Sequence, residues 1–269
     1  VPGELKSHRA APITVSWGLG RFSCFLASGA EDGQVIIWRE VRPEEWQLAH
    51  QLNVTGSANV VGWCPPDYGL TLAVAGGDDV GVVTMLSRRD GSGGGSSASE
   101  NWQVRSFVAH PGGVASLSWS PSTSAAMLAT GPAVGRAATL APCRLATCGA
   151  DGAVSIWSMD GKMDWRKQND LEAEDFRGTP RDIAWRPNIG VPSSLVAACT
   201  DQGSVAIWAQ DMEGQPWRLR ACWQVGGDAR RVEWSKAGTV LCVSIGDADT
   251  ATYREGQSGS WDLIAPLEG

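Results

Sequence analysis

Short apolar runs separated by turn residues recur along the chain, and the clearest is CRLATCGADGAVSIW at residues 143–157. Small apolar residues lead to the turn Gly149–Gly152, and Val154 and Ile156 then alternate with a polar residue up to Trp157. Glycine tolerates positive φ, and aspartate bonds its own backbone in tight turns. Alternation with a period of two is typical of half-buried strands. The stretch therefore predicts two short antiparallel strands joined by a hairpin.

The hairpin has four further copies, two of them decayed, and each copy is flanked by tryptophans in fixed slots. The copies end at Trp38, Leu86, Trp157, Trp208 and Tyr253. Short strands before them end at Trp17, Trp63, Trp119, Trp185 and Trp234, and a third slot holds Trp46, Trp102, Trp165, Trp217 and Trp261. Of the 14 tryptophans, only Trp223 lies outside these slots, so the periodicity reflects repeated structure.

Repetition near the length of a WD-type blade predicts an all-β WD-repeat β-propeller with five recognisable blades in a single domain, residues 1–269. An irregular β-sandwich is the alternative. Residues 1–12 are expected to end a preceding blade, so the first blade is absent from this sequence, unless the protein is truly five-bladed. The expected blades cover about 13–52, 59–108, 114–169, 180–222 and 230–264, with disordered insertions at 90–100 and 122–142. No helical period is apparent, so almost no helix is expected.

Composition narrows the classes of partner. A net charge of −7 argues against a broad nucleic-acid footprint and against direct binding to an anionic membrane. The seven cysteines do not suggest a disulfide framework, because several lie in apolar strand positions where cysteine behaves as a small buried hydrophobe. These positions are Cys24, Cys148, Cys199 and Cys242. We therefore expect a cytosolic or nuclear protein.

A buried polar chain of His, Ser or Thr, Asp and Trp is predicted to hold two of the blades. Its members are His8, Ser28, Asp32 and Trp38 in one blade, and His110, Thr147, Asp151 and Trp157 in another. Trp only donates and ionised Asp only accepts, so His and a hydroxyl can relay between them. The fourth blade lacks the His, and the fifth has Tyr253 in place of Trp. Packing is expected to hold these two blades instead.

The same residue types could suggest a hydrolase triad, but the supporting motifs are missing. No Gly-x-Ser-x-Gly elbow, His-Glu-x-x-His motif or phosphate-binding Gly-Lys-Ser/Thr loop occurs. Cys143 and Cys148 have no second pair with which to hold zinc. We therefore predict no enzymatic activity, no cofactor and no metal. A propeller enzyme remains the alternative and requires ionisable residues clustered at the mouth of the central channel.

Several turns between blades are more specific than the repeat itself. They are the segment Arg181–Trp208 with Pro216-Trp217 after it, the WCPPDYG turn from Trp63, the segment Trp234–Asp247, and the closing Gly259–Trp261. With these turns the chain resembles the Sec-thirteen family of COPII coat propellers. The resemblance extends from Leu5 to Ile264, apart from the two insertions.

The resemblance implies an open six-bladed propeller that serves as a non-enzymatic scaffold. The family acts in the COPII outer coat of ER-to-Golgi transport and in the Y-shaped nuclear pore scaffold. A partner donates a blade in trans: a Sec-thirty-one-like coat subunit or a Nup-ninety-six-type nucleoporin. Localisation would be cytoplasmic, at ER exit sites and vesicles, and at nuclear pores, with only indirect membrane contact through the coat. The alternatives are a sister nucleoporin propeller of the Seh type and a generic WD-repeat adaptor.

The open seam that receives the donated blade is assigned by this resemblance to the last recognisable blade. The expected seam residues are Arg230, Arg231, Val232 and Trp234, in the inner strand of that blade. An open sheet edge or face of this kind favours association with another chain.

Overall fold

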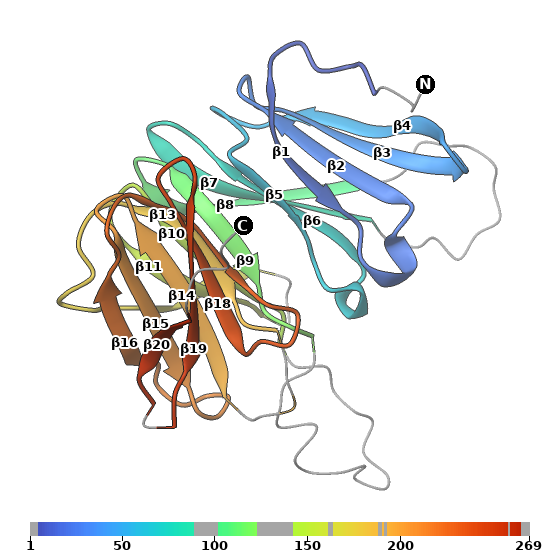
Figure 1. Cartoon of the computed structure of the whole chain (residues 1–269). Helices are drawn as coiled ribbons and strands as arrows, with labels where there is room; N and C mark the ends of the chain where they lie inside the picture. The colour runs from blue at the N-terminus through green and yellow to red at the C-terminus, as the bar shows by residue number, and fades with distance from the viewer. Residues whose placement is uncertain are drawn as a thin grey trace, which may run out of the picture. The chain divides into compact units, whose positions relative to one another are not determined.

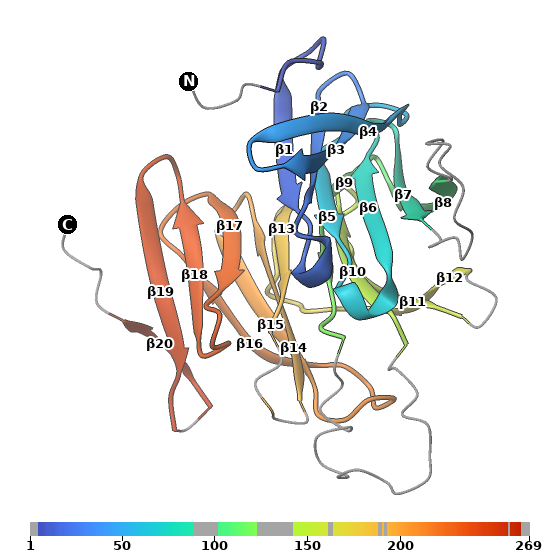
Figure 2. The ribbon, with the colours of Figure 1, turned by 90° about the vertical axis from the view of Figure 1, so that its right-hand side faces the viewer.

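A computed structural model of the 269-residue chain describes residues 5–88, 102–122, 142–160, 164–187, 190, 193–257 and 259–264 (Figures 1 and 2). The expected insertion at 90–100 lies outside the described residues, as does the insertion at 122–142 except for its two end residues. Residues 5–11 form no strand, and the expectation that residues 1–12 end an earlier blade stays a prediction.

The described strands form five four-stranded antiparallel sheets, and within each sheet the strands are ordered as in the sequence. The first sheet is β1 (Pro12–Trp17), β2 (Phe25–Ala30), β3 (Gln34–Arg42) and β4 (Glu45–Asn53), and the second is β5 (Val60–Trp63), β6 (Leu70–Gly76), β7 (Val80–Arg88) and β8 (Trp102–Pro111). The third is β9 (Val114–Trp119), β10 (Arg144–Gly149), β11 (Val154–Met159) and β12 (Trp165–Asp170). The fourth is β13 (Pro180–Trp185), β14 (Ser194–Thr200), β15 (Ser204–Gln210) and β16 (Arg218–Gln224), and the fifth is β17 (Ala229–Trp234), β18 (Val240–Ile245), β19 (Asp249–Glu255) and β20 (Trp261–Ile264).

These sheets confirm the predicted all-β class with five WD-type blades. Helix in the described part of the chain is limited to two single turns, η1 (Gly20–Phe22) and η2 (Pro66–Tyr68). No helix among the described residues is long and apolar enough to cross a membrane. The chain divides into two compact units, residues 1–115 and 116–269, and the predicted single domain stays a prediction.

The hairpins between the second and third strands form where the sequence predicts them. At the first, the Asp32 carboxylate accepts the backbone N–H of Gln34 at 3.1 Å, and Gly33 adopts φ +77°. A Cβ at Gly33 would collide with the carbonyl oxygen of Gly56, so the turn requires glycine for both conformation and space. In the third sheet, Asp151 accepts the N–H two residues later in the same way.

The tryptophans of the second and third sequence slots meet as pairs within each sheet. The ring centroids lie 5.4 Å apart for Trp17–Trp46, 6.3 Å for Trp63–Trp102, 5.7 Å for Trp119–Trp165, 5.5 Å for Trp185–Trp217 and 5.5 Å for Trp234–Trp261. All five pairs are tilted or edge-to-face, which is the arrangement that the aromatic quadrupole favours. The two slots are therefore one repeated contact, between the end of the first strand and the start of the last strand of each sheet, with Trp217 one residue before β16.

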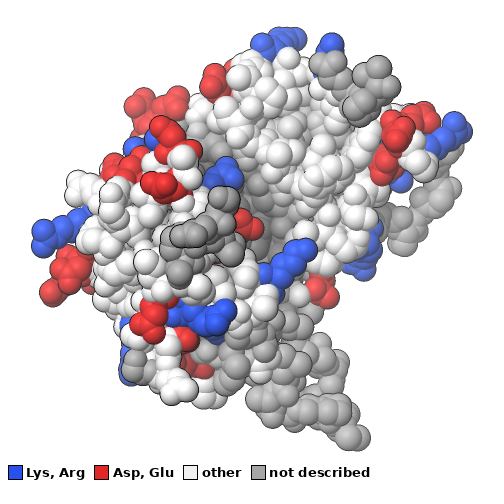
Figure 3. Space-filling model, viewed as in Figure 1, with Lys and Arg blue, Asp and Glu red and all other residues white. Residues whose placement is uncertain are grey.

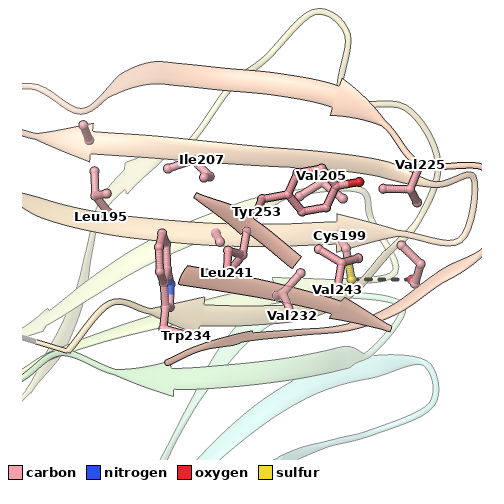
Figure 4. Close-up of a cluster of buried hydrophobic side chains, with 13 residues drawn as sticks. Leu195, Cys199, Val205, Ile207, Val225, Val232, Trp234, Leu241, Val243 and Tyr253 are labelled. Carbon is pink, nitrogen blue, oxygen red and sulfur yellow. Dashed lines mark hydrogen bonds between the residues drawn. The ribbon is translucent and has the colours of Figure 1, made fainter. Parts of the chain in front are cut away.

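Each unit has its own hydrophobic core, formed where two successive sheets pack face to face. In the first unit, Phe25, Ala27, Val35 and Ile37 of the first sheet meet Val61, Trp63, Leu72 and Leu86 of the second. In the second unit, Leu195, Ala197, Cys199, Val205 and Ile207 of the fourth sheet meet Val232, Trp234, Leu241, Val243 and Tyr253 of the fifth (Figure 4). Burial of these alternating apolar residues is the main force that holds the sheets together.

All seven cysteines are free thiols. Cys148 and Cys199 are fully buried, as predicted, and burial raises the pKa of both thiols. Cys24 and Cys242 are only half-buried, and Cys24 lies one residue before β2, so the prediction of burial is wrong for these two. No group of three or more potential metal ligands occurs among the described residues.

Candidate partner-binding surfaces

The polar chain predicted in the first sheet joins three of its four members. The Nε2 atom of His8 lies 2.6 Å from the hydroxyl oxygen of Ser28, and the indole N–H of Trp38 donates to the same oxygen at 3.1 Å. Asp32 serves in the hairpin turn instead, and no hydrogen bond joins it to His8 within the described part of the chain. Because the carboxylate does not orient the imidazole, this set has no triad geometry.

His8 holds the segment before β1 onto the first hairpin as a neutral residue. Burial lowers the pKa of the imidazole, and the Gln34 side chain and the Asp32 charge only partly oppose this effect. A neutral imidazole can exchange a hydrogen bond with a hydroxyl at no cost of buried charge. The contact is therefore structural.

In the third sheet the corresponding bond links Thr147 and Trp157. The indole N–H of Trp157 donates to the Thr147 hydroxyl at 2.9 Å, and both side chains are buried. Asp151 lies at the exposed hairpin. His110 is fully buried in β8, opposite Gly81, and belongs to the first unit.

Replacing Thr147 with valine is expected to lower the free energy of unfolding by about 1–3 kcal/mol, because the buried indole N–H of Trp157 loses its acceptor. Valine keeps the shape of threonine, so the cost reports the lost hydroxyl. Denaturant unfolding followed by circular dichroism measures it. Thr147→Ser, which retains the hydroxyl, is the matched control and should cost less. Equal losses in both variants would contradict the assignment.

The fourth sheet is held by polar bonds rather than by packing alone, so the sequence-based expectation for it is wrong. The indole N–H of Trp208 donates to the carbonyl of Glu172 at 3.0 Å. Thr200 donates its hydroxyl to the carbonyl of Arg177 at 2.6 Å, and Asp201 accepts the backbone N–H of Thr179 at 2.8 Å. Backbone groups of residues 172–179 thus take the place of the missing histidine. Sequence cannot reveal this, because a carbonyl acceptor leaves no residue signature.

Successive sheets are also joined at their first strands by a bond that recurs at the same position. The indole N–H of Trp63 donates to the carbonyl of Ser16 at 3.1 Å, and that of Trp234 donates to the carbonyl of Ala184 at 3.1 Å. In both cases the acceptor is the residue before the terminal tryptophan of the preceding sheet's first strand. The tryptophan therefore packs within its own sheet and bonds to the sheet before it.

Side chains add a second set of bonds between the same strands. The residues one and three positions before the terminal tryptophan accept backbone N–H groups from the next sheet. The bonds are Thr14 Oγ1 to Val61 N at 3.3 Å, Ser16 Oγ to Trp63 N at 3.4 Å, Ser118 Oγ to Trp185 N at 2.9 Å, and Asp182 Oδ2 to Val232 N at 3.0 Å. The first strands of these neighbouring sheets are therefore joined by hydrogen bonds at the same positions.

Asp182 connects three sheets of the second unit. One carboxylate oxygen accepts the hydroxyl of Ser116 at 2.7 Å from β9, and the other accepts the N–H of Val232 from β17. Burial raises the pKa of Asp182, and these hydrogen bonds and the Arg231 charge only partly offset that effect. Asp182 belongs to no catalytic or metal-binding motif in the sequence, although its position three before Trp185 repeats that of Thr14.

The four expected seam residues separate into inward and outward positions. Val232 and Trp234 are buried against the fourth sheet and cannot meet a partner there, so this part of the expectation is wrong (Figure 4). Arg230 forms ion pairs with Asp228 and Asp247 near the end of the sheet. Arg231 is exposed, as is Glu233, which sequence reasoning missed although the alternation in RRVEW places both on the face opposite Val232.

The face of the first sheet that does not pack against the second sheet is apolar and exposed. Ile13, Val15, Trp17 and Leu48 are 42%, 63%, 57% and 47% exposed. Strand register places Trp17 and Leu48 on one face, and Figure 3 shows mainly uncharged residues over this sheet. The equivalent positions in the second sheet, Val61 and Trp63, are 5% and 4% exposed. This face therefore has the apolar chemistry of the internal contacts, and exposed apolar patches of this kind are typical of interaction sites.

The WD domain, G-beta repeat family matches residues 101–158. "Protein transport protein SEC13" of Cryptococcus neoformans is 32% identical over 290 residues, covering 98% of this chain and 83% of the relative. "Protein SEC13 homolog" of Drosophila melanogaster is 31% identical over 266 residues, covering 97% of this chain and 70% of the relative. The structure of Sqt1 from Chaetomium thermophilum has a TM-score of 0.68 at 17% identity, covering 96% of this chain and 59% of Sqt1, which supports the fold alone.

The matched repeat agrees with the observed sheets, and the SEC13 relatives align over nearly the whole chain. The turns between sheets that carry the sequence resemblance lie within the aligned length. The chain belongs to the SEC13 family of WD-repeat proteins.

Proposed function

We propose that this chain is a scaffold subunit of the COPII outer vesicle coat, in ER-to-Golgi transport, and of the Y-shaped nuclear pore scaffold. Relatives that align with 98% of the chain are named protein transport protein SEC13. The family and its repeat class are structural, and the chain is a non-enzymatic protein. Its role is therefore to bind other proteins.

The observation that carries the proposal is that neighbouring sheets pack together through the same set of contacts. Between the first two sheets, and between the fourth and fifth, the same backbone and indole bonds accompany a buried apolar contact. The fifth sheet turns Arg231 and Glu233 outward, and both are exposed. A sheet donated by a partner can place its first strand against this face with backbone bonds at the same positions, because the Glu233 carboxylate can accept an N–H group as Ser16 and Ser118 do.

The partner proposed for the coat is a Sec-thirty-one-like subunit, and the partner proposed for the pore is a Nup-ninety-six-type nucleoporin. Each would donate a blade to the fifth sheet. The complexes would place the protein at ER exit sites, on coated vesicles and at nuclear pores, with membranes reached only through the coat.

The test is co-expression of the 269-residue chain with each of these two partners from the same genome, followed by size-exclusion chromatography and mass determination. We expect a stable one-to-one complex with each. Fluorescent tagging of the chain in cells should mark both ER exit sites and the nuclear envelope. If neither partner co-elutes and a pull-down from extract recovers other complexes at stoichiometric levels, the protein is a different WD-repeat adaptor.

A further inference from the structure

In three sheets, the residue three positions before the terminal tryptophan of the first strand forms a hydrogen bond with the next sheet. In the first, third and fourth sheets it is Thr14, Ser116 and Asp182, and each of these side chains can accept a hydrogen bond. In the fifth sheet it is Arg231, whose guanidinium only donates. A strand that packs on the outward side of the fifth sheet must therefore offer a hydrogen-bond acceptor at this position, whereas the backbone N–H groups that meet Thr14 and Asp182 are donors.

Residues at this position lie next to one another in successive sheets of the second unit. The Ser116 hydroxyl donates to the Asp182 carboxylate at 2.7 Å, and the Arg231 charge stabilises the ionised form of Asp182. A hydroxyl, a carboxylate and a guanidinium therefore follow one another at this position in the third, fourth and fifth sheets. The same geometry places the corresponding residue of an added sheet beside Arg231.

The third strand of the fifth sheet also differs from the matching strand at an internal contact. The third strand of the fourth sheet presents Val205, Ile207 and Ala209 to the fifth sheet, and all three are buried. The matching strand of the fifth sheet presents Thr250, Thr252 and Arg254 outward. A partner strand that lies over this part of the face must therefore offer polar groups rather than apolar side chains.

Arg231 and Glu233 are available for an added strand. Within the described part of the chain, neither side chain forms an ion pair or a hydrogen bond, and both are exposed. Glu233 stands at the position of Ser16 and Ser118, whose hydroxyls accept N–H groups of the next first strand. Its carboxylate can accept such an N–H group.

We propose that the outward face of the fifth sheet selects a partner strand carrying a carboxylate opposite Arg231, with a backbone N–H of that strand donated to Glu233. This proposal rests on the partner docking described above and specifies its chemistry. The pairing of opposite charges at an exposed face makes the contact sensitive to salt, because ions screen charges that face solvent.

The experiment measures the affinity of the 269-residue chain for the Sec-thirty-one-like subunit by calorimetry, at low and at high salt. Arg231→Glu should weaken binding about tenfold, since it replaces an attraction with a like-charge repulsion. Glu233→Lys should weaken binding by a similar factor, and added salt should weaken binding of the unmodified chain. Reversing the facing acidic residue of the partner to lysine should restore binding to Arg231→Glu.

Arg218→Glu, an exposed arginine on β16 of the fourth sheet, is the matched control and should leave the affinity unchanged. If the unmodified chain binds but both outward variants bind equally well, the charge pairing is wrong while the proposed partner stands. If the unmodified chain does not bind, the proposed function fails and this proposal fails with it.

Discussion

Replacing Trp208 with alanine is expected to lower the free energy of unfolding by about 3–5 kcal/mol, the range for removing a large aromatic side chain from a packed core. Trp208 is 1% exposed, and its ring meets Phe176 edge-to-face at 5.3 Å. The substitution also leaves the carbonyl of Glu172 without its indole donor. Chemical denaturation followed by circular dichroism measures the change.

Trp208→Phe is the control for this substitution, because it keeps most of the apolar volume while removing the donor. It should cost clearly less than the alanine variant. A Trp208→Ala protein that unfolds at the same denaturant concentration as the unmodified chain would contradict the burial and the bond to residues 172–179.

Replacing Asp182 with alanine should cost about 2–6 kcal/mol, because two donors from two other sheets lose their acceptor at about 1–3 kcal/mol each. The donors are the hydroxyl of Ser116 and the N–H of Val232. Asp182→Asn retains one acceptor oxygen and should be less damaging. Chemical denaturation of the two variants measures the difference. Equal stability of the alanine variant and the unmodified chain would show that Asp182 does not hold the three sheets together.

The raised pKa of Asp182 predicts the direction in which folding stability changes with pH. Its folded-state pKa is raised above 3.8 by burial, so the folded chain binds the proton more tightly than the unfolded chain does. Binding of this proton adds to the free energy of unfolding. The added stability is fully present below pH 3.8 and is lost as the pH rises through the folded-state pKa. The unmodified chain should therefore lose stability relative to Asp182→Asn over that window. A difference between the two that does not vary with pH would contradict the raised pKa.

Much of the architecture was predictable because it depends on residue patterns that are local and repeated along the chain. The hairpin at Asp151-Gly152 needs only turn chemistry and alternating strands. The tryptophan slots predicted five blades, and the structure shows that the second and third slots meet as pairs such as Trp17–Trp46. Periodicity thus revealed the repeat unit, since each unit makes the same contacts at the same spacing.

The bonds between sheets were not predictable to the same degree. Two tryptophans, Trp63 and Trp234, donate to backbone carbonyls of another sheet, and any residue can supply a carbonyl. The fourth sheet replaces a histidine with the backbone of residues 172–179 for the same reason. Hydrogen bonds to the main chain carry no residue signature, so sequence patterns miss them.

By itself, the sequence determined the strands, the turns and the sheet-forming repeat, because these depend on residues close along the chain. Only the tertiary structure decided which side of each strand is covered. It buries Val232 and Trp234 against the fourth sheet, leaves Arg231 outward, and leaves Val15 and Trp17 of the first sheet exposed. The physical reason is that alternation assigns residues to two faces, whereas burial of a face depends on which distant sheet packs against it.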